Sequence, residues 1–138
     1  MRVYLAAAMT NPDRDLDLLG RVLEHIEAGG HVVPTRHIVA PDGKQRDSAL
    51  TDAELARRDL DWIAGCDALV AEVSTPSHGV GVEVMAALAR NMPVLLLRRE
   101  GIPVSRLLLG LPGVVTASYR SVGEASAAID GFLAGVTL

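Results

Sequence analysis

Short, continuous apolar segments alternate with longer helix-like segments along the whole chain, and this alternation most constrains the fold. The apolar segments, which predict strands, are residues 3–8, 31–34, 68–73, 93–97 and 114–117. Continuous apolar strands are typical of parallel sheets that are buried on both faces. The longer segments, which predict helices, are residues 13–28, 51–64, 79–91 and 121–134, with a short helix or turn at 102–109. Right-handed crossovers then give a three-layer, doubly wound α/β sandwich of the flavodoxin or Rossmann-like type, with a five-stranded parallel sheet.

Length and composition indicate one domain that spans residues 1–138. Hydrophobic residues make up 49% of the chain and charged residues 22%, the balance of a folded rather than a disordered protein. The net charge of −4 argues against a nucleic-acid-binding protein, which needs a basic face. No apolar segment has the length of a membrane span and no signal peptide is recognisable, so we expect a cytoplasmic protein without a membrane partner.

The residues that usually bind metals and cofactors are few. Cys66 is the only cysteine, which excludes an internal disulfide framework and a zinc site built from several cysteines. His37 and His78 have no metal-ligand spacing to each other or to Cys66. The segment G-V-G-V-E-V at residues 79–84 has Val84 where a dinucleotide-binding motif needs its third glycine. We therefore expect neither a metal nor an organic cofactor.

The predicted fold indicates where a ligand would bind. Ligands of doubly wound folds lie beyond the carboxyl ends of the strands. In this chain that edge comprises residues 7–11, 35–37 and 73–83. The polar segment 35–50 is predicted to be a long loop, and a loop of this length in a compact domain is usually functional or mobile.

Asp59 is a carboxylate on an apolar helix face. Its helical neighbours are Leu55, Trp62 and Ile63, which places it on the buried side of the predicted helix 51–64. Burial of a carboxylate is unfavourable unless the group is paired, and it raises the pKa. Asp59 is therefore either an acid of a functional site or a core aspartate that a backbone N–H or an arginine satisfies.

Glu83 is the second candidate carboxylate. We predict it in the first turn of the helix 79–91, just after Gly79 and Gly81, whose N–H groups could bind an anion. The helix macrodipole should keep Glu83 ionised there, and its alternative role is that of a favourable helix-start glutamate. One protonated and one ionised carboxylate is the arrangement that separates acid from nucleophile in glycosyl transfer. The helix itself is apolar nearly all round and is expected to be buried.

Four other side chains near the predicted ligand-binding edge are candidates for a structural or a functional role. Ser77 could cap the following helix or hold a phosphate. Ser105 is a further helix-cap candidate. Tyr4 lies in the middle of a strand, where most tyrosines are simply packed, and His37 follows the second predicted strand at a pocket-facing position.

Three sequence features together resemble a known family. They are Tyr4, the segment R-D-L-D-W-I at residues 58–63 and, above all, A-E-V-S-T-P-S-H-G-V-G-V-E at residues 71–83. These features are similar to those of the 2′-deoxynucleoside 5′-phosphate N-hydrolases, within the nucleoside 2-deoxyribosyltransferase superfamily. The likeness extends from the first strand to the last helix.

The resemblance implies an enzyme that hydrolyses the N-glycosidic bond of (2′-deoxy)nucleoside 5′-monophosphates to free base and (2-deoxy)ribose 5-phosphate. It implies that Glu83 is the nucleophile that attacks the anomeric carbon C1′ and forms a covalent glycosyl-enzyme intermediate. Asp59 would assist the departing base and then help to activate water. Tyr4 would orient the nucleophile or the sugar.

The resemblance also implies the substrate contacts. His37 matches a histidine of the family's base pocket, and Ser77 matches the serine that binds the 5′-phosphate. Ser105 matches a serine that reaches the phosphate in the neighbouring subunit's site, which implies a homodimer with shared active sites.

The loop after the first strand departs from the family pattern. The family usually has G-S-I-R-G-G there, whereas this chain has A-A-M-T-N at residues 7–11. Phosphate contacts in this loop are therefore expected from backbone N–H groups of Ala7 and Ala8, and Met9 is expected to line the base side of the pocket.

Three alternative functions stay open from the sequence. The first is base exchange by a nucleoside 2-deoxyribosyltransferase, in which an acceptor base replaces water. The second is a ribonucleotide N-glycosidase that acts, for example, on CMP. The third is a non-enzymatic nucleotide-binding module, which the presence of both Asp59 and Glu83 disfavours, because binding alone does not need two anions beside an anionic ligand.

Overall fold

Four of the continuous apolar segments form a parallel sheet. The computed structural model describes residues 1–138, and its strands are β1 (Val3–Ala6), β2 (Ala68–Glu72), β3 (Val94–Arg99) and β4 (Val114–Tyr119). They are ordered β1-β2-β3-β4, and all neighbouring pairs are parallel. Every residue of β1 and β2 is buried, as continuous apolar strands require.

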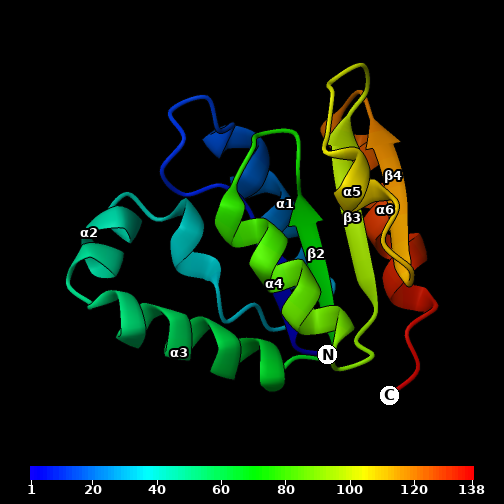
Figure 1. Cartoon of the computed structure of the whole chain (residues 1–138). Helices are drawn as coiled ribbons and strands as arrows, with labels where there is room; N and C mark the ends of the chain where they lie inside the picture. Colours follow the sequence, from blue (N-terminus) through cyan, green and yellow to red (C-terminus); the bar gives the residue numbers. More distant parts are fainter.

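Helices cover both faces of the sheet and give the three-layer, Rossmann-like α/β fold (Figure 1). One face packs against α1 (Leu16–Ala28) and α6 (Val122–Ala134), and the other against α3 (Asp52–Ala64), α4 (His78–Leu88) and the short α5 (Arg106–Leu109). The core is accordingly divided into two apolar clusters, one on each side of the strands. The layers agree with the sequence prediction.

The prediction of a fifth strand was wrong. Residues 31–34 make only an isolated bridge, between Val32 and Arg2 beside β1. Pro34 has no N–H to continue a ladder, so the pairing stops there. The buried Thr35 replaces it, because its Oγ1 donates to the Leu5 carbonyl at 2.7 Å and accepts from the Leu5 N–H at 3.1 Å. A side chain thus satisfies the outer edge of β1.

The segment 35–50 is not one long loop. It contains a 3₁₀ helix, η1 (Arg36–Val39), and a short helix, α2 (Gly43–Ser48). Both are shorter than the window over which helical periodicity can be recognised in a sequence. In Figure 1, α2 lies beside the first turns of α3, away from the sheet. The segment is therefore an ordered structure at the edge of the domain.

The prediction that the helix containing Glu83 is buried all round was also wrong. Val80, Val84 and Ala87 of α4 are buried, but Val82 is 64% exposed and Met85 is 50% exposed. One side of α4 therefore presents apolar side chains to solvent.

Candidate active site

A hydrogen bond between β1 and α4 lies at the centre of the candidate site. Tyr4 points from β1 toward α4, is 1% exposed, and donates its hydroxyl hydrogen to Glu83 Oε1 at 2.6 Å. Ser77 is the N-cap and α4 begins at His78, so Glu83 lies in the second turn. The prediction that it lies in the first turn was wrong. The side chain of Tyr4 thus fixes the position of one Glu83 oxygen.

Asp59 reaches the same place from α3. Its side chain is 19% exposed, and its Oδ1 lies 2.8 Å from Arg58 Nη2 and accepts from Arg58 Nε at 2.9 Å. Asp59, Glu83 and Tyr4 line one cavity. The structure therefore places the two candidate carboxylates in one site, with an arginine beside Asp59.

Burial sets the charge of Glu83. Loss of hydration raises the pKa of Glu83 to about 7, the Tyr4 hydrogen bond opposes this rise, and the negative charge of Asp59 adds to it. The prediction that the helix macrodipole keeps Glu83 ionised was wrong, because Glu83 lies beyond the first turn and is buried. Burial raises the pKa of Tyr4, and the negative charge of Glu83 raises it further, so the Tyr4 hydroxyl stays protonated and donates.

A second set of polar side chains adjoins the carboxylates. Asp47 of α2 accepts a hydrogen bond from Arg58 Nη1 at 2.8 Å, and the same oxygen lies 3.2 Å from His37 Nε2. The His37 ring lies 5.5 Å from the Trp62 ring, which in turn lies 4.6 Å from the Arg58 guanidinium. Asp47 was not predicted as a site residue, because the short helix that carries it was predicted to be a loop.

The cavity that these side chains enclose is small, with a volume of about 30 Å³. Most of the predicted site residues line it: Tyr4, Ala7, Met9, His37, Asp59 and Glu83. Ala8 is buried next to it, and its carbonyl accepts a hydrogen bond from Arg14 at 3.3 Å. Arg14 also donates to the Ile38 carbonyl at 2.9 Å, which ties the loop after β1 to η1. Arg14 is a further residue that the sequence did not single out.

The two serines predicted to contact phosphate lie outside this cavity. Ser77 caps α4 by accepting from the Val80 N–H at 3.3 Å, and Ser105 caps α5 by accepting from the Leu108 N–H at 3.4 Å. Ser77, Gly81 and Ser105 line a largely apolar groove of about 850 Å³ between α4 and α5. Gly79 lies in the first turn of α4.

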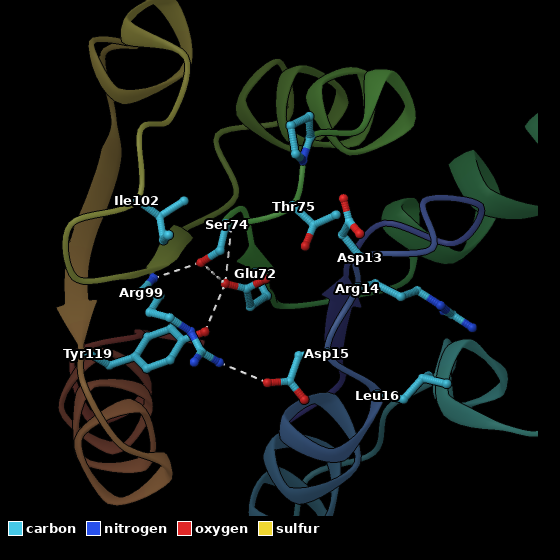
Figure 2. Close-up of a pocket in the computed structure, with 11 residues that line it drawn as sticks. Asp13, Arg14, Asp15, Leu16, Glu72, Ser74, Thr75, Arg99, Ile102 and Tyr119 are labelled. Carbon is cyan, nitrogen blue, oxygen red and sulfur yellow. Dashed lines mark hydrogen bonds and ion pairs between the residues drawn. The ribbon is translucent and has the colours of Figure 1, made fainter.

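A third cavity, of about 600 Å³, lies at the carboxyl ends of β2, β3 and β4 (Figure 2). The buried Glu72 carboxylate there accepts hydrogen bonds from the Ser74 hydroxyl, from the Ser74 N–H at 3.1 Å and from Tyr119 Oη at 3.0 Å. Arg99 extends over Tyr119 and pairs with Asp15 at 2.8 Å. This network anchors the turn between β2 and α4, which carries Ser77.

Comparison with known proteins identifies the family. The model of a family described as nucleoside 2-deoxyribosyltransferase matches residues 3–125. The chain belongs to this family. A Thermofilum pendens relative, provisionally named 2′-deoxynucleoside 5′-phosphate N-hydrolase 1, is 37% identical over 139 residues, which cover 98% of this chain and 96% of the relative.

Two other matches extend the comparison. The 5-hydroxymethyl-dUMP N-hydrolase of Mus musculus is 33% identical over 99 residues, which cover 70% of this chain and 57% of the relative. The structure of the CMP N-glycosidase BcmB of Clostridium botulinum superposes with a TM-score of 0.72 at 22% identity, over 96% of this chain and 99% of that chain. The latter shows that the two proteins share a fold.

The structure contains neither a membrane-spanning helix nor a cluster of metal ligands. None of its helices combines the length and apolarity needed to cross a bilayer. No three His, Cys, Asp or Glu side chains are grouped so that they could hold a metal ion.

Proposed function

We propose that this protein hydrolyses the N-glycosidic bond of (2′-deoxy)nucleoside 5′-monophosphates and releases the free base and (2-deoxy)ribose 5-phosphate. The observation that carries the proposal is the Glu83 carboxylate, held by Tyr4 at 2.6 Å in a cavity that Asp59 shares. The family and the relatives named as nucleotide N-hydrolases support the same reaction class.

In the first step, a Glu83 oxygen attacks C1′ while the bond from C1′ to the base nitrogen breaks. The electron pair of that bond leaves with the base, which takes a proton from Asp59. A carboxylate next to C1′ stabilises the oxocarbenium character of the transition state and then traps the sugar as a glycosyl ester. Tyr4 binds one Glu83 oxygen and leaves the other to react.

In the second step, Asp59 takes a proton from water, and the water oxygen attacks C1′. The ester bond breaks, its electron pair returns to Glu83, and the sugar phosphate departs. Asp59 is protonated again and Glu83 is ionised again, so the cycle closes with one water consumed. An acceptor base in place of water would give base exchange at the same two carboxylates.

Substrate binding requires the segment 35–50 to move. A cavity of about 30 Å³ holds little more than one water molecule, whereas pockets for ligands of this size are about 300–1,000 Å³. His37, Ile38 and Asp47 of this segment form one wall of the cavity. We propose that η1 and α2 swing outward to admit the nucleotide and then close over its base.

We further propose that a second copy of the chain covers the groove between α4 and α5. Val82, Met85 and Leu107 are 64%, 50% and 80% exposed there, which is unusual for a group of large apolar side chains on a monomer. Ser77 and Ser105 line the same groove. Docking across it would bring the partner subunit's Ser105 toward the start of α4, where Ser77 is expected to bind the 5′-phosphate.

A substrate panel tests the proposed activity. The purified protein is incubated with dNMPs, NMPs and free deoxynucleosides, and the released base and sugar phosphate are identified by chromatography. We expect base release from the 5′-monophosphates, and none from any substrate with Glu83→Gln. Adding an isotope-labelled free base detects exchange, and labelled nucleotide as the main product would establish a transferase instead. Release from NMPs alone would establish a ribonucleotide N-glycosidase, and undiminished turnover by Glu83→Gln would refute the covalent mechanism.

Asp59→Asn tests the acid role. We expect a loss of about 10²–10⁴-fold in kcat, the usual contribution of a positioned proton donor. Asp61→Asn is the matched control, because Asp61 is exposed on the same helix. Equal rates for both variants would remove Asp59 from the mechanism.

A further inference from the structure

His37 contains the one buried side-chain nitrogen or oxygen without a hydrogen-bond partner, Nδ1. The residue is 7% exposed and lines the cavity of Glu83 and Asp59. An unpartnered buried polar atom costs about 1–3 kcal/mol, so such atoms call for an explanation. At a ligand cavity, the explanation is a hydrogen bond that the ligand completes.

Asp47 determines which kind of hydrogen bond is missing. A carboxylate only accepts hydrogen bonds, so the His37 nitrogen that lies 3.2 Å from Asp47, Nε2, carries the ring hydrogen. Burial lowers the pKa of His37, which keeps the ring neutral. The second nitrogen, Nδ1, therefore has a free lone pair and can only accept.

The surroundings hold this arrangement in place. Arg58 donates to the same Asp47 oxygen at 2.8 Å, which fixes the carboxylate between the arginine and the histidine. Trp62 lies against the imidazole, with ring centroids 5.5 Å apart and planes tilted by 50°. The second Asp47 oxygen, Oδ2, receives no hydrogen bond within the protein. Two acceptor atoms of cavity-lining residues thus have no donor, His37 Nδ1 and Asp47 Oδ2.

We propose that Asp47 is a positioning residue that holds His37 as a hydrogen-bond acceptor, so that the enzyme selects nucleotides whose base carries an exocyclic amino group. This inference rests on the proposed function. An amino group offers two N–H donors to the two acceptors. A carbonyl oxygen in its place would put lone pair against lone pair and leave the buried nitrogen unpartnered, which disfavours keto bases.

The test compares nucleotides that differ in this group: dCMP with dUMP, and dAMP with dIMP. In the wild type we expect kcat/KM to favour the amino member of each pair by roughly 5- to 150-fold, the range for satisfying one buried polar group. Asp47→Leu removes the oxygen that lies 3.2 Å from Nε2, so the ring hydrogen is no longer held on Nε2 and the preference should shrink or disappear. The control is Asp42→Asn, an exposed carboxylate of the same segment that pairs only with Arg46, and it should keep the wild-type ratio. Equal kcat/KM for both members in the wild type would overturn the inference.

Nitrogen-15 NMR of the histidine rings provides a readout that does not depend on turnover. We expect an unprotonated His37 Nδ1 in the wild type and a mixture of the two ring tautomers in Asp47→Leu. The Nδ1 signal should move when dCMP is added to Glu83→Gln, and less with dUMP. If no nucleotide is hydrolysed, the proposed function fails, and this binding response still decides the inference. A hydrogen on Nδ1 in the wild type, or equal responses to both nucleotides, would refute it.

Discussion

Replacing Tyr4 by phenylalanine should raise the pKa of Glu83 above its value of about 7. The Tyr4 hydroxyl donates to Glu83 Oε1 at 2.6 Å and is the main group that favours the ionised carboxylate. A hydrogen bond to a charged group contributes about 1.5–3 kcal/mol, and about 1.4 kcal/mol corresponds to one pKa unit. Its loss should therefore move the titration of Glu83 upward by roughly 1–2 pH units. Phenylalanine keeps the buried ring, so the packing of β1 is preserved.

Two measurements follow this change. Carbon-13 NMR of the glutamate carboxyl carbons gives the titration of Glu83 in the free protein. The pH dependence of kcat/KM reports the pKa of Glu83 during turnover, because only the ionised carboxylate attacks C1′. The acid limb of the profile should move to higher pH in Tyr4→Phe, with lower activity at pH 7.

The other tyrosine of the chain provides the matched control. Tyr119 is 2% exposed and also donates to a carboxylate, Glu72, at 3.0 Å, but it lies at the far edge of the sheet. Tyr119→Phe should lower stability and leave the Glu83 titration in place. An unchanged or lowered pKa of Glu83 in Tyr4→Phe would refute the reasoning, since the hydrogen bond would then not stabilise the charged form.

Three further predictions concern stability and assembly. Burial raises the pKa of Glu83 from 4.5 to about 7, so folding favours its protonated form. The free energy of unfolding should therefore fall by up to about 3 kcal/mol as the pH rises from 4.5 to about 7. Denaturant titrations of Glu83→Gln should show no such pH dependence. Thr35→Val leaves the Leu5 N–H and carbonyl without partners and should cost about 1–3 kcal/mol in the same assay, whereas Thr35→Ser, which keeps the hydroxyl, should cost less. Leu107→Asp should convert a dimer into monomers in sedimentation experiments, and Leu138→Asp, at an equally exposed site away from the groove, should not; a dimer that persists in Leu107→Asp would place the interface elsewhere.

The sequence determined the layers of the fold and indicated the side chains that we propose for the site. Continuous apolar segments and helix signals are local patterns, and they located β1 to β4 and the helices α1, α3, α4 and α6. Asp59 was found because its helical neighbours are apolar, and Glu83 because it stands alone in an apolar helix. The predicted position of the ligand site followed from the rule that the carboxyl ends of parallel strands meet at one edge.

Only the tertiary structure decided how these side chains behave. Tyr4 and Glu83 are 79 positions apart, and the charge state of Glu83 depends on the burial and the hydrogen bond that arise when β1 and α4 come together. Asp47 became a site residue because a short helix, which has no recognisable period, lies against Arg58 of α3. The pairing of the predicted fifth strand stops at Pro34, and the Thr35 side chain satisfies the edge of β1 instead. Local sequence patterns record which residues avoid water, whereas hydration, charge and hydrogen-bond partners depend on neighbours that only folding brings together.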